Sequence, residues 1–134
     1  MVLDSWPVME WLKLREPATT MFDAILDEAK SGRLRLVIST INLGEIYYNC
    51  IDVWQQAQAD VILADFRELP IEIFHPSQAD ALRGARIKGL YRGAYGDAFA
   101  AVLAMELIAP VATGDPDFLK LRNAGVLTVE WLGK

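Results

Sequence analysis

Short apolar runs alternate with longer segments of helical character along the whole sequence, and this alternation limits the possible folds. The runs predict strands at residues 1–3, 34–38, 71–74, 110–113 and 127–132. Strands separated by helices pair in parallel, because each connection has to cross over the sheet. The runs 34–38 and 110–113 show no clean polar alternation, which is typical of strands covered on both faces. The pattern therefore predicts an α/β sandwich with helices on both sides of a small, mostly parallel central sheet.

Residues that start and stop helices stand between the predicted strands. Gly32 and Gly125 follow helical segments and suit helix ends, and Ser77 with Asp80 has the spacing of a capping box. The helix after Gly96 is apolar almost all round, which places it close to the core. Helix starts are predicted at Ser5, which acts as a cap, and at Pro17, Ser39, residue 55, Ser77, Gly96 and Asp115.

The length and composition suit one folded domain spanning residues 1–134. Hydrophobic residues make up 53% of the chain, which excludes disorder. The net charge of −5 argues against a protein whose whole surface binds nucleic acid, but it is compatible with a local basic patch. A single cysteine, Cys50, allows no disulfide framework and no zinc cluster within the chain.

Neither a signal peptide nor a membrane span is expected. The first residues lack a basic region followed by an apolar one. The longest apolar stretch, residues 98–112, is too short for a span and contains Glu106 and Pro110. We therefore expect a soluble, cytoplasmic protein that does not act at a membrane.

Four acidic residues stand at equivalent places, where predicted strands end or helices begin. Asp4 ends the first strand, and Asp115 follows the fourth. Glu45 lies in the helix after the second strand, and Asp97 begins the apolar helix that runs back into the fourth. In a parallel sheet these positions meet at the carboxyl edge, where ligands bind in α/β folds.

Each acid alone is compatible with a structural role, because carboxylates cap helices and complement the helix dipole. Together they repel: two unit charges 4 Å apart cost about 4 kcal/mol at an effective dielectric constant of about 20. A domain has only about 5–15 kcal/mol of stability. Such a cluster therefore needs a cation or partly protonated carboxylates, and its oxygen ligands favour Mg²⁺ or Mn²⁺ over zinc.

Four segments that occur in order, "VLDS", "ISTINLGEIYY", "YGDAFAAVLA" and "VATGDPDF", resemble the PIN domain. The likeness is greatest to the VapC-type ribonuclease toxins of toxin–antitoxin modules, and it spans residues 2–118. The resemblance implies a PIN-like three-layer α/β/α sandwich and metal-dependent hydrolysis of RNA phosphodiester bonds. It also implies an antitoxin protein as a partner. The middle helices, residues 50–68, match no motif of the family.

The resemblance also implies roles for individual residues. The catalytic, metal-binding positions are Asp4, Glu45, Asp97 and Asp115, and Asp117 is a further acid that assists metal binding. The small hydroxyl residues beside these acids, expected to support them, are Ser5, Ser39 and Thr113.

A basic stretch precedes Asp97, with Arg83, Arg86, Lys88 and Arg92 and no intervening acid. One interpretation is a solvated helix face. The other is that these cations hold RNA phosphates against an acidic pocket that would repel them. We predict substrate binding for Arg86 and Arg92.

Other interpretations stay open at this point. A PIN domain also suits a housekeeping RNA-processing nuclease, which the identity of a neighbouring gene would distinguish from a toxin. A receiver-like signalling module with an Mg²⁺ pocket fits less well, because "VLDSW" offers one acid where that module needs two. A catalytically inactive interaction module conflicts with the four intact acids. Exposed apolar helix surface would suit a homodimer, and the tryptophans are expected in the core or at such a contact.

Overall fold

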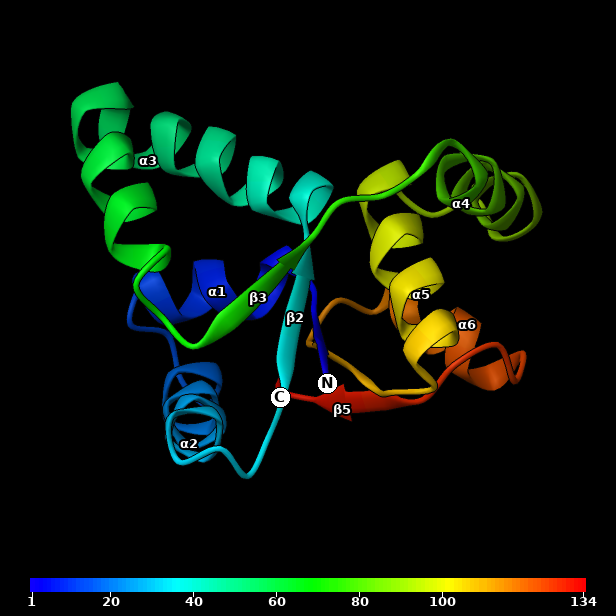
Figure 1. Ribbon diagram of the computed structural model, residues 1–134, viewed down its shortest axis with the longest axis horizontal. Coiled ribbons are helices and arrows are strands. Elements are labelled where there is room, and N and C mark those ends of the chain that lie inside the picture. Colours follow the sequence, from blue (N-terminus) through cyan, green and yellow to red (C-terminus); the bar gives the residue numbers. More distant parts are fainter.

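A five-stranded parallel sheet forms the centre of the computed structural model, which describes residues 1–134 (Figure 1). The strand order is β3-β2-β1-β4-β5. The strands are β1 (Val2–Leu3), β2 (Leu36–Ser39), β3 (Ile71–Phe74), β4 (Val111–Thr113) and β5 (Val129–Trp131). All five predicted strands are present, and the prediction of a parallel sheet is confirmed.

Helices cover both faces of this sheet. They are α1 (Ser5–Leu12), α2 (Ala18–Lys30), α3 (Thr40–Phe66), α4 (Gln78–Tyr91), α5 (Tyr95–Leu107) and α6 (Asp117–Asn123). The first three pack on one face and the last three on the other, as Figure 1 shows on the two sides of β2. Successive strand residues point to opposite faces, so Leu3 joins one core cluster and Val2 the other. The predicted three-layer α/β/α sandwich is therefore confirmed.

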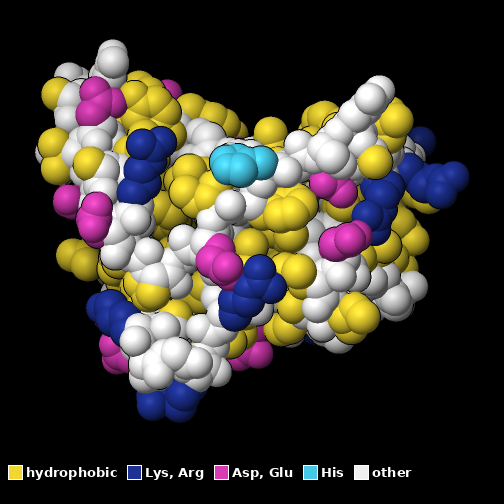
Figure 2. All heavy atoms as spheres, in the orientation of Figure 1, with side chains coloured by type: hydrophobic (Ala, Val, Ile, Leu, Met, Phe, Trp, Pro, Cys, Tyr) yellow, Lys and Arg dark blue, Asp and Glu magenta, His cyan; other side chains and the backbone are white.

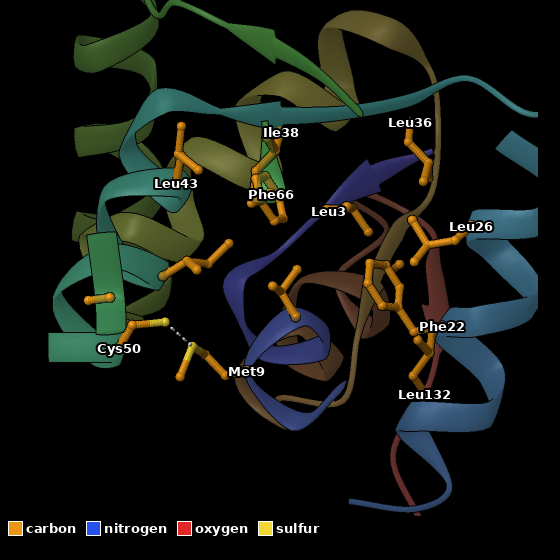
Figure 3. Packing of buried hydrophobic residues seen from close by; sticks show 14 residues of the cluster. Leu3, Met9, Phe22, Leu26, Leu36, Ile38, Leu43, Cys50, Phe66 and Leu132 are labelled. Atoms are coloured by element: carbon orange, nitrogen blue, oxygen red, sulfur yellow. Dashed lines mark hydrogen bonds between the residues drawn. The ribbon is translucent and has the colours of Figure 1, made fainter. Parts of the chain in front are cut away.

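The larger core cluster lies between the sheet and helices α1 to α3 (Figure 3). Phe22 of α2 is completely buried, and Trp11 meets it edge-on with ring centroids 5.4 Å apart. Cys50 is also buried, and its sulfur lies 4.0 Å from the sulfur of Met9. These contacts join α1 to α2 and to the first half of α3, and all three helices share the core cluster on one face of the sheet.

Most observed helix starts lie within one residue of the predicted ones, but α6 begins at Asp117, two residues after the predicted start at Asp115, and the prediction for Ser5 also needs a correction. Ser5 is not the cap of α1, because Asp4 occupies the N-cap position and Ser5 is the first helical residue. Ser39 does cap α3 by accepting a hydrogen bond from the backbone N–H of Ile41. The two helices predicted to meet near residue 55 follow each other without a loop, with a kink at Gln55, whose φ is 66°.

The strand order determines where a ligand site can form. β1 lies in the middle with β2 on one side and β4 on the other, and the connections after β1 and β4 leave on opposite faces. A crevice at the carboxyl ends of two such strands is where parallel α/β sheets bind ligands. Asp4 directly follows β1, and Asp115 lies two residues after β4. None of the helices combines the length and apolar character needed to cross a membrane.

Candidate metal centre

Three carboxylates meet at the carboxyl edge between β1 and β4. Asp4, Asp97 and Asp115 each offer an oxygen, and these three oxygens lie within 4.8 Å of one another. Asp4 is 1% exposed and Asp97 is 8% exposed, whereas Asp115 is partly exposed. Asp97 reaches the site from the first turn of α5. This helix precedes β4 and runs back along the sheet toward the start of that strand, as predicted. Three of the four predicted acids are thus brought together.

Glu45, the fourth acid, lies beside this group rather than within it. It comes from the second turn of α3, and its carboxylate rests on Gly96, the residue before Asp97. A Cβ atom at residue 96 would be 2.3 Å from Glu45 Oε2, so only glycine leaves room for the acid here. The charge of Glu45 contributes to raising the pKa of both Asp4 and Asp97.

Hydrogen bonds link the acids that follow the two central strands. Thr113 donates its hydroxyl to Asp4 Oδ2 at 2.8 Å and accepts the backbone N–H of Asp115 at 3.0 Å. Ser5 lies at the long distance of 3.5 Å from Asp4 Oδ1. Ser39 is buried and caps the helix that carries Glu45, as described above. Of the three predicted hydroxyl residues, Thr113 therefore makes the shortest contact with an acid.

Asp117 begins α6 at the rim of the site. Its backbone N–H donates to Asp115 Oδ1 at 3.0 Å, and its own carboxylate forms an ion pair with Lys120 at 3.0 Å. Asp115 therefore helps to shape the start of α6 as well as joining the carboxylate group. Asp117 stays outside the group of three oxygens. Its predicted role in metal binding stays a prediction.

The ring of Trp6 supports the loop that carries Asp115. A Cβ atom at Gly114 would lie 2.2 Å from this ring, so the loop backbone packs directly on the indole. Trp6 also contacts the core cluster on the α1 side of the sheet. This placement agrees with the expectation that the tryptophan packs in the core.

Burial dominates the electrostatics of the site. Desolvation raises the pKa of Asp4 to about 7, and the charges of Glu45 and Asp115 act in the same direction while the Thr113 hydrogen bond opposes them. Desolvation, followed by the charges of Asp4, Asp115 and its other acidic neighbours, raises the pKa of Asp97 to about 8. Without a cation, these two carboxyl groups are therefore substantially protonated near neutral pH.

The arrangement fits a hard divalent cation. Asp97 Oδ2 is buried and has no hydrogen-bond partner, and an unsatisfied buried acceptor is costly. The ligand atoms available around it are carboxylate oxygens, which Mg²⁺ and Mn²⁺ prefer. Asp4, Asp97 and Asp115 are the residues that could hold such an ion, with Glu45 close by.

Asn42 is a site residue that the sequence reasoning missed. It is completely buried, and its Nδ2 donates to Glu45 Oε1 at 2.7 Å and to the backbone carbonyl of Gly96 at 3.0 Å. The sequence spacing could have indicated this role, because residues three apart on a helix, such as Asn42 and Glu45, lie on the same helix face. Asn42 is also a polar residue beside the apolar Leu43 and Ile46.

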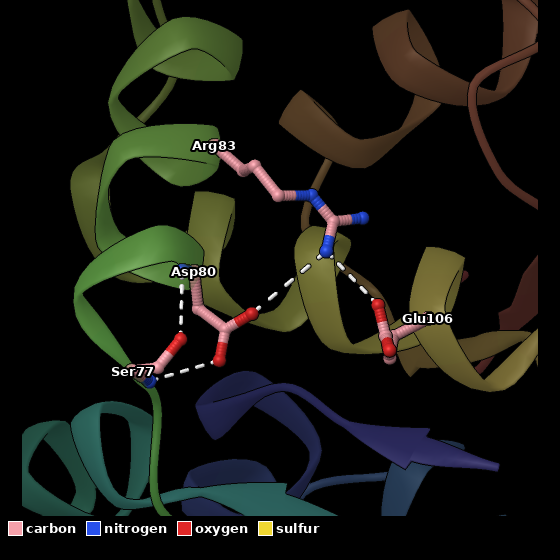
Figure 4. Close-up of polar contacts among 4 residues, drawn as sticks. All are labelled: Ser77, Asp80, Arg83 and Glu106. Carbon is pink, nitrogen blue, oxygen red and sulfur yellow. Dashed lines mark hydrogen bonds and ion pairs between the residues drawn. The ribbon is translucent and has the colours of Figure 1, made fainter.

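Two cations of the basic stretch have partners within the protein, and two do not. Figure 4 shows Arg83 of α4 bridging Asp80 and Glu106, at 3.8 and 2.9 Å. Arg86 and Arg92 are exposed and take part in none of the ion pairs. The remaining cation, Lys88, donates to the backbone carbonyl of Gly93 at 3.0 Å. Within the basic stretch, only the side chains of Arg86 and Arg92 thus make no hydrogen bond or ion pair.

The surface is hollowed at the edge of the sheet where the strands end. In Figure 2 the outline is notched between the parts formed by α3 and α4, and the single histidine, His75, lies exposed on the visible face just below this notch. His75 directly follows β3, which agrees with its expected place at a strand end. A large ligand therefore has an approach to this edge between the two helices.

Comparisons with known proteins agree with this architecture. The family model of the PIN domain matches residues 1–124. VapBC2 from Rickettsia felis, in a structure bound to a DNA fragment from its promoter, is 18% identical with a TM-score of 0.70, covering 96% of each chain. VapBC-1 from nontypeable Haemophilus influenzae is 18% identical with a TM-score of 0.70, covering 98% of this chain and 96% of that one. FitAcB from Neisseria gonorrhoeae is 19% identical with a TM-score of 0.66, covering 96% of each chain. No curated protein matched.

The raised pKa values predict how the metal-free protein responds to pH. From about pH 4, the ordinary pKa of an aspartate, up to the folded values of about 7 and 8, the folded state binds more protons than the unfolded state. The free energy of unfolding should therefore fall as the pH rises through this range. Asp97→Asn should raise the melting temperature in EDTA at about pH 8 and flatten its pH dependence.

Thermal melts in EDTA across this pH range measure the effect. Asp27→Asn, on the exposed surface of α2, removes the same charge outside the site and serves as the control. An Asp97→Asn variant whose melting temperature follows that of Asp27→Asn at every pH contradicts the prediction.

Proposed function

Because this chain belongs to the PIN domain family, we propose that it is a metal-dependent endoribonuclease. The observation that carries the proposal is the meeting of Asp4, Asp97 and Asp115 around an unpartnered buried carboxylate oxygen. A divalent ion bound there, Mg²⁺ or Mn²⁺, would neutralise phosphate charge and lower the pKa of a water molecule for attack on the phosphodiester. Family membership also argues against the receiver-like alternative.

In this proposal, some residues bind the ion and others orient the residues that bind it. Asp4, Asp97 and Asp115 would hold the ion, with Glu45 at their side and Asp117 at the rim. Thr113 fixes one oxygen of Asp4 and the backbone of Asp115, so both acids are oriented before a ligand arrives. Preorganised ligands lose little freedom on binding, which favours tight and specific coordination.

The substrate has to approach an acidic site although it is itself an anion. Arg86 lies on α4, and Arg92 ends that helix with a φ of 59°, in the left-handed region where glycine is favoured. Both side chains are exposed and unpaired, and in this proposal they contact phosphates of the RNA. An RNA strand held in this way would enter through the hollow at the strand ends.

The cellular role we favour is that of a toxin paired with an antitoxin protein. Its support is the similarity of the fold to VapBC and FitAcB structures over almost the whole chain. We further propose that residues 1–134 form one domain that acts in the cytoplasm, and that it pairs as a homodimer. A housekeeping RNA-processing nuclease is the alternative, because it would use the same acids.

Metal binding and cleavage test the activity together. Mn²⁺ at about 100 times its Kd should raise the free energy of unfolding of the parent protein by about 2.7 kcal/mol. Asp115→Asn should lose most of this gain, although asparagine caps a helix about as well as aspartate. RNA cleavage should fall sharply in Asp97→Asn and Asp115→Asn, as measured on a labelled oligonucleotide.

The same melts with EDTA and with Mn²⁺ provide the comparison, and Asp27→Asn again serves as the charge control. If the parent and the Asp115→Asn variant gain equally from Mn²⁺ and cleave RNA alike, Asp115 is only a helix cap and the proposed metal site is wrong.

The roles of Arg86 and Arg92 are tested through salt. If each arginine neutralises one phosphate of a single strand, the double variant Arg86→Ala/Arg92→Ala should reduce the slope of log K against log salt by about 1.4. The measurement is fluorescence anisotropy of a labelled RNA at several salt concentrations, without the divalent ion. Arg33→Ala/Arg35→Ala removes the same charge from exposed arginines that pair with Glu28 and Glu72, and it should leave the slope unchanged. Equal slopes in the two double variants refute this role.

Expression tests the toxin assignment. The parent protein should be poorly tolerated by growing cells when it is expressed alone, and co-expression of the product of its neighbouring gene should restore growth. Asp97→Asn should be tolerated without the partner. Normal growth with a folded parent protein that cleaves RNA in vitro would favour the housekeeping alternative.

A further inference from the structure

The amide of Asn42 joins the two helices that carry Glu45 and Asp97. Asn42 lies in the first turn of α3, on one face of the sheet, and Gly96 lies in the first turn of α5, on the other. Its Nδ2 donates to Glu45 Oε1 at 2.7 Å and to the Gly96 carbonyl at 3.0 Å. One side chain thus spans the carboxyl edge of the sheet.

The orientation of this amide follows from its neighbours. The Gly96 carbonyl can only accept a hydrogen bond, and so can an ionised Glu45 carboxylate. The amide must therefore present its nitrogen to both, which leaves Asn42 Oδ1 buried and without a partner. A buried amide with an unsatisfied oxygen is costly, and an apolar residue of similar size would avoid that cost. Fold stability alone therefore does not account for an asparagine here.

The Asn42 amide can hold the Glu45 carboxylate in place against electrostatic repulsion. Glu45 is only partly buried, and a side chain of its length has several staggered rotamers available. The negative charge of Asp115 favours rotamers that take the Glu45 carboxylate away from the site. The Asn42 bond opposes them, because it holds Oε1 while the rest of the carboxylate rests on Gly96.

We infer that Asn42 is a positioning residue, which fixes the Glu45 carboxylate over Gly96 and so keeps it beside the three aspartates as part of the metal-binding set. The inference rests on the proposed function, because it assigns Asn42 a part in the same site. It adds a residue that acts on the metal site through Glu45 and whose second hydrogen bond goes to the Gly96 carbonyl.

Metal affinity tests this role without relying on activity. Asn42→Leu keeps the approximate size of the side chain but cannot donate. It should weaken Mn²⁺ binding by about 10- to 100-fold, the usual loss when a residue that orients a metal ligand is removed. Binding is measured by titrating the protein and following free Mn²⁺ by electron paramagnetic resonance at fixed pH. Asn42→Ala serves the same purpose if the leucine variant does not fold, as judged by thermal melts in EDTA.

Asn49→Leu is the matched control. Asn49 lies on the same helix and donates at 2.9 Å to the backbone carbonyl of Glu45 rather than to its carboxylate. This variant should bind Mn²⁺ as the parent does. An Asn42→Leu variant with the affinity of Asn49→Leu overturns the inference.

A double-mutant cycle separates positioning from a general structural effect. In a Glu45→Ala background, Asn42→Leu should cause no further loss of Mn²⁺ affinity, because the group that it positions is gone. An equal loss in both backgrounds overturns the inference, since Asn42 would then act on the site by another route. A parent protein that binds no Mn²⁺ overturns the proposed function itself, and with it the inference. The two failures are therefore distinguishable in one set of titrations.

Discussion

Burial of carboxyl groups at the carboxyl edge of the sheet is the constraint that the rest of the structure has to accommodate. Asp4 and Asp97 are buried within 4.8 Å of each other and of Asp115, although each charge disfavours the others. The fold holds Asp4 and Asp115 there because β1 and β4 are neighbours in the buried centre of the sheet, and α5 brings Asp97 to the same edge. Thr113 and Asn42 then supply hydrogen bonds that a collection of acids alone would lack. Burying these acids costs stability when no cation is bound, because Asp97 Oδ2 has no hydrogen-bond partner.

Much of this arrangement could be predicted from the sequence, because it depends on strand direction. Once the apolar runs are assigned as parallel strands, residues that follow them fall on one edge, as Asp4 and Asp115 do. The position of Asp97 needed a further step, namely that a crossover helix runs back along the sheet and begins near its carboxyl edge. The roles of the predicted residues in binding metal and RNA stay predictions.

The differences between expectation and structure arise from contacts between distant residues. A serine after an aspartate suggested a helix cap, but the Asp4 carboxylate makes no capping bond and instead accepts one from Thr113, 109 residues away. In the sequence, Arg83 cannot be distinguished from the other cations of the basic stretch, but in the structure it forms an ion pair with Glu106. Asn42 was hidden among apolar neighbours, and its contact with Gly96 spans 54 residues. Local patterns cannot report such partners.

The central position of β1 determines how early the acidic site can form while the protein is being synthesised. β1 is made before the other four strands and pairs on one side with β2, but its other neighbour, β4, begins only at Val111. Until that strand has emerged, Asp4 has neither Thr113 nor Asp115 beside it. Chains that stop before this point cannot assemble the cluster, however well their first helices fold. A nascent chain therefore lacks the complete set of acids through most of its synthesis, because the last of them, Asp115, lies near the end of the sequence.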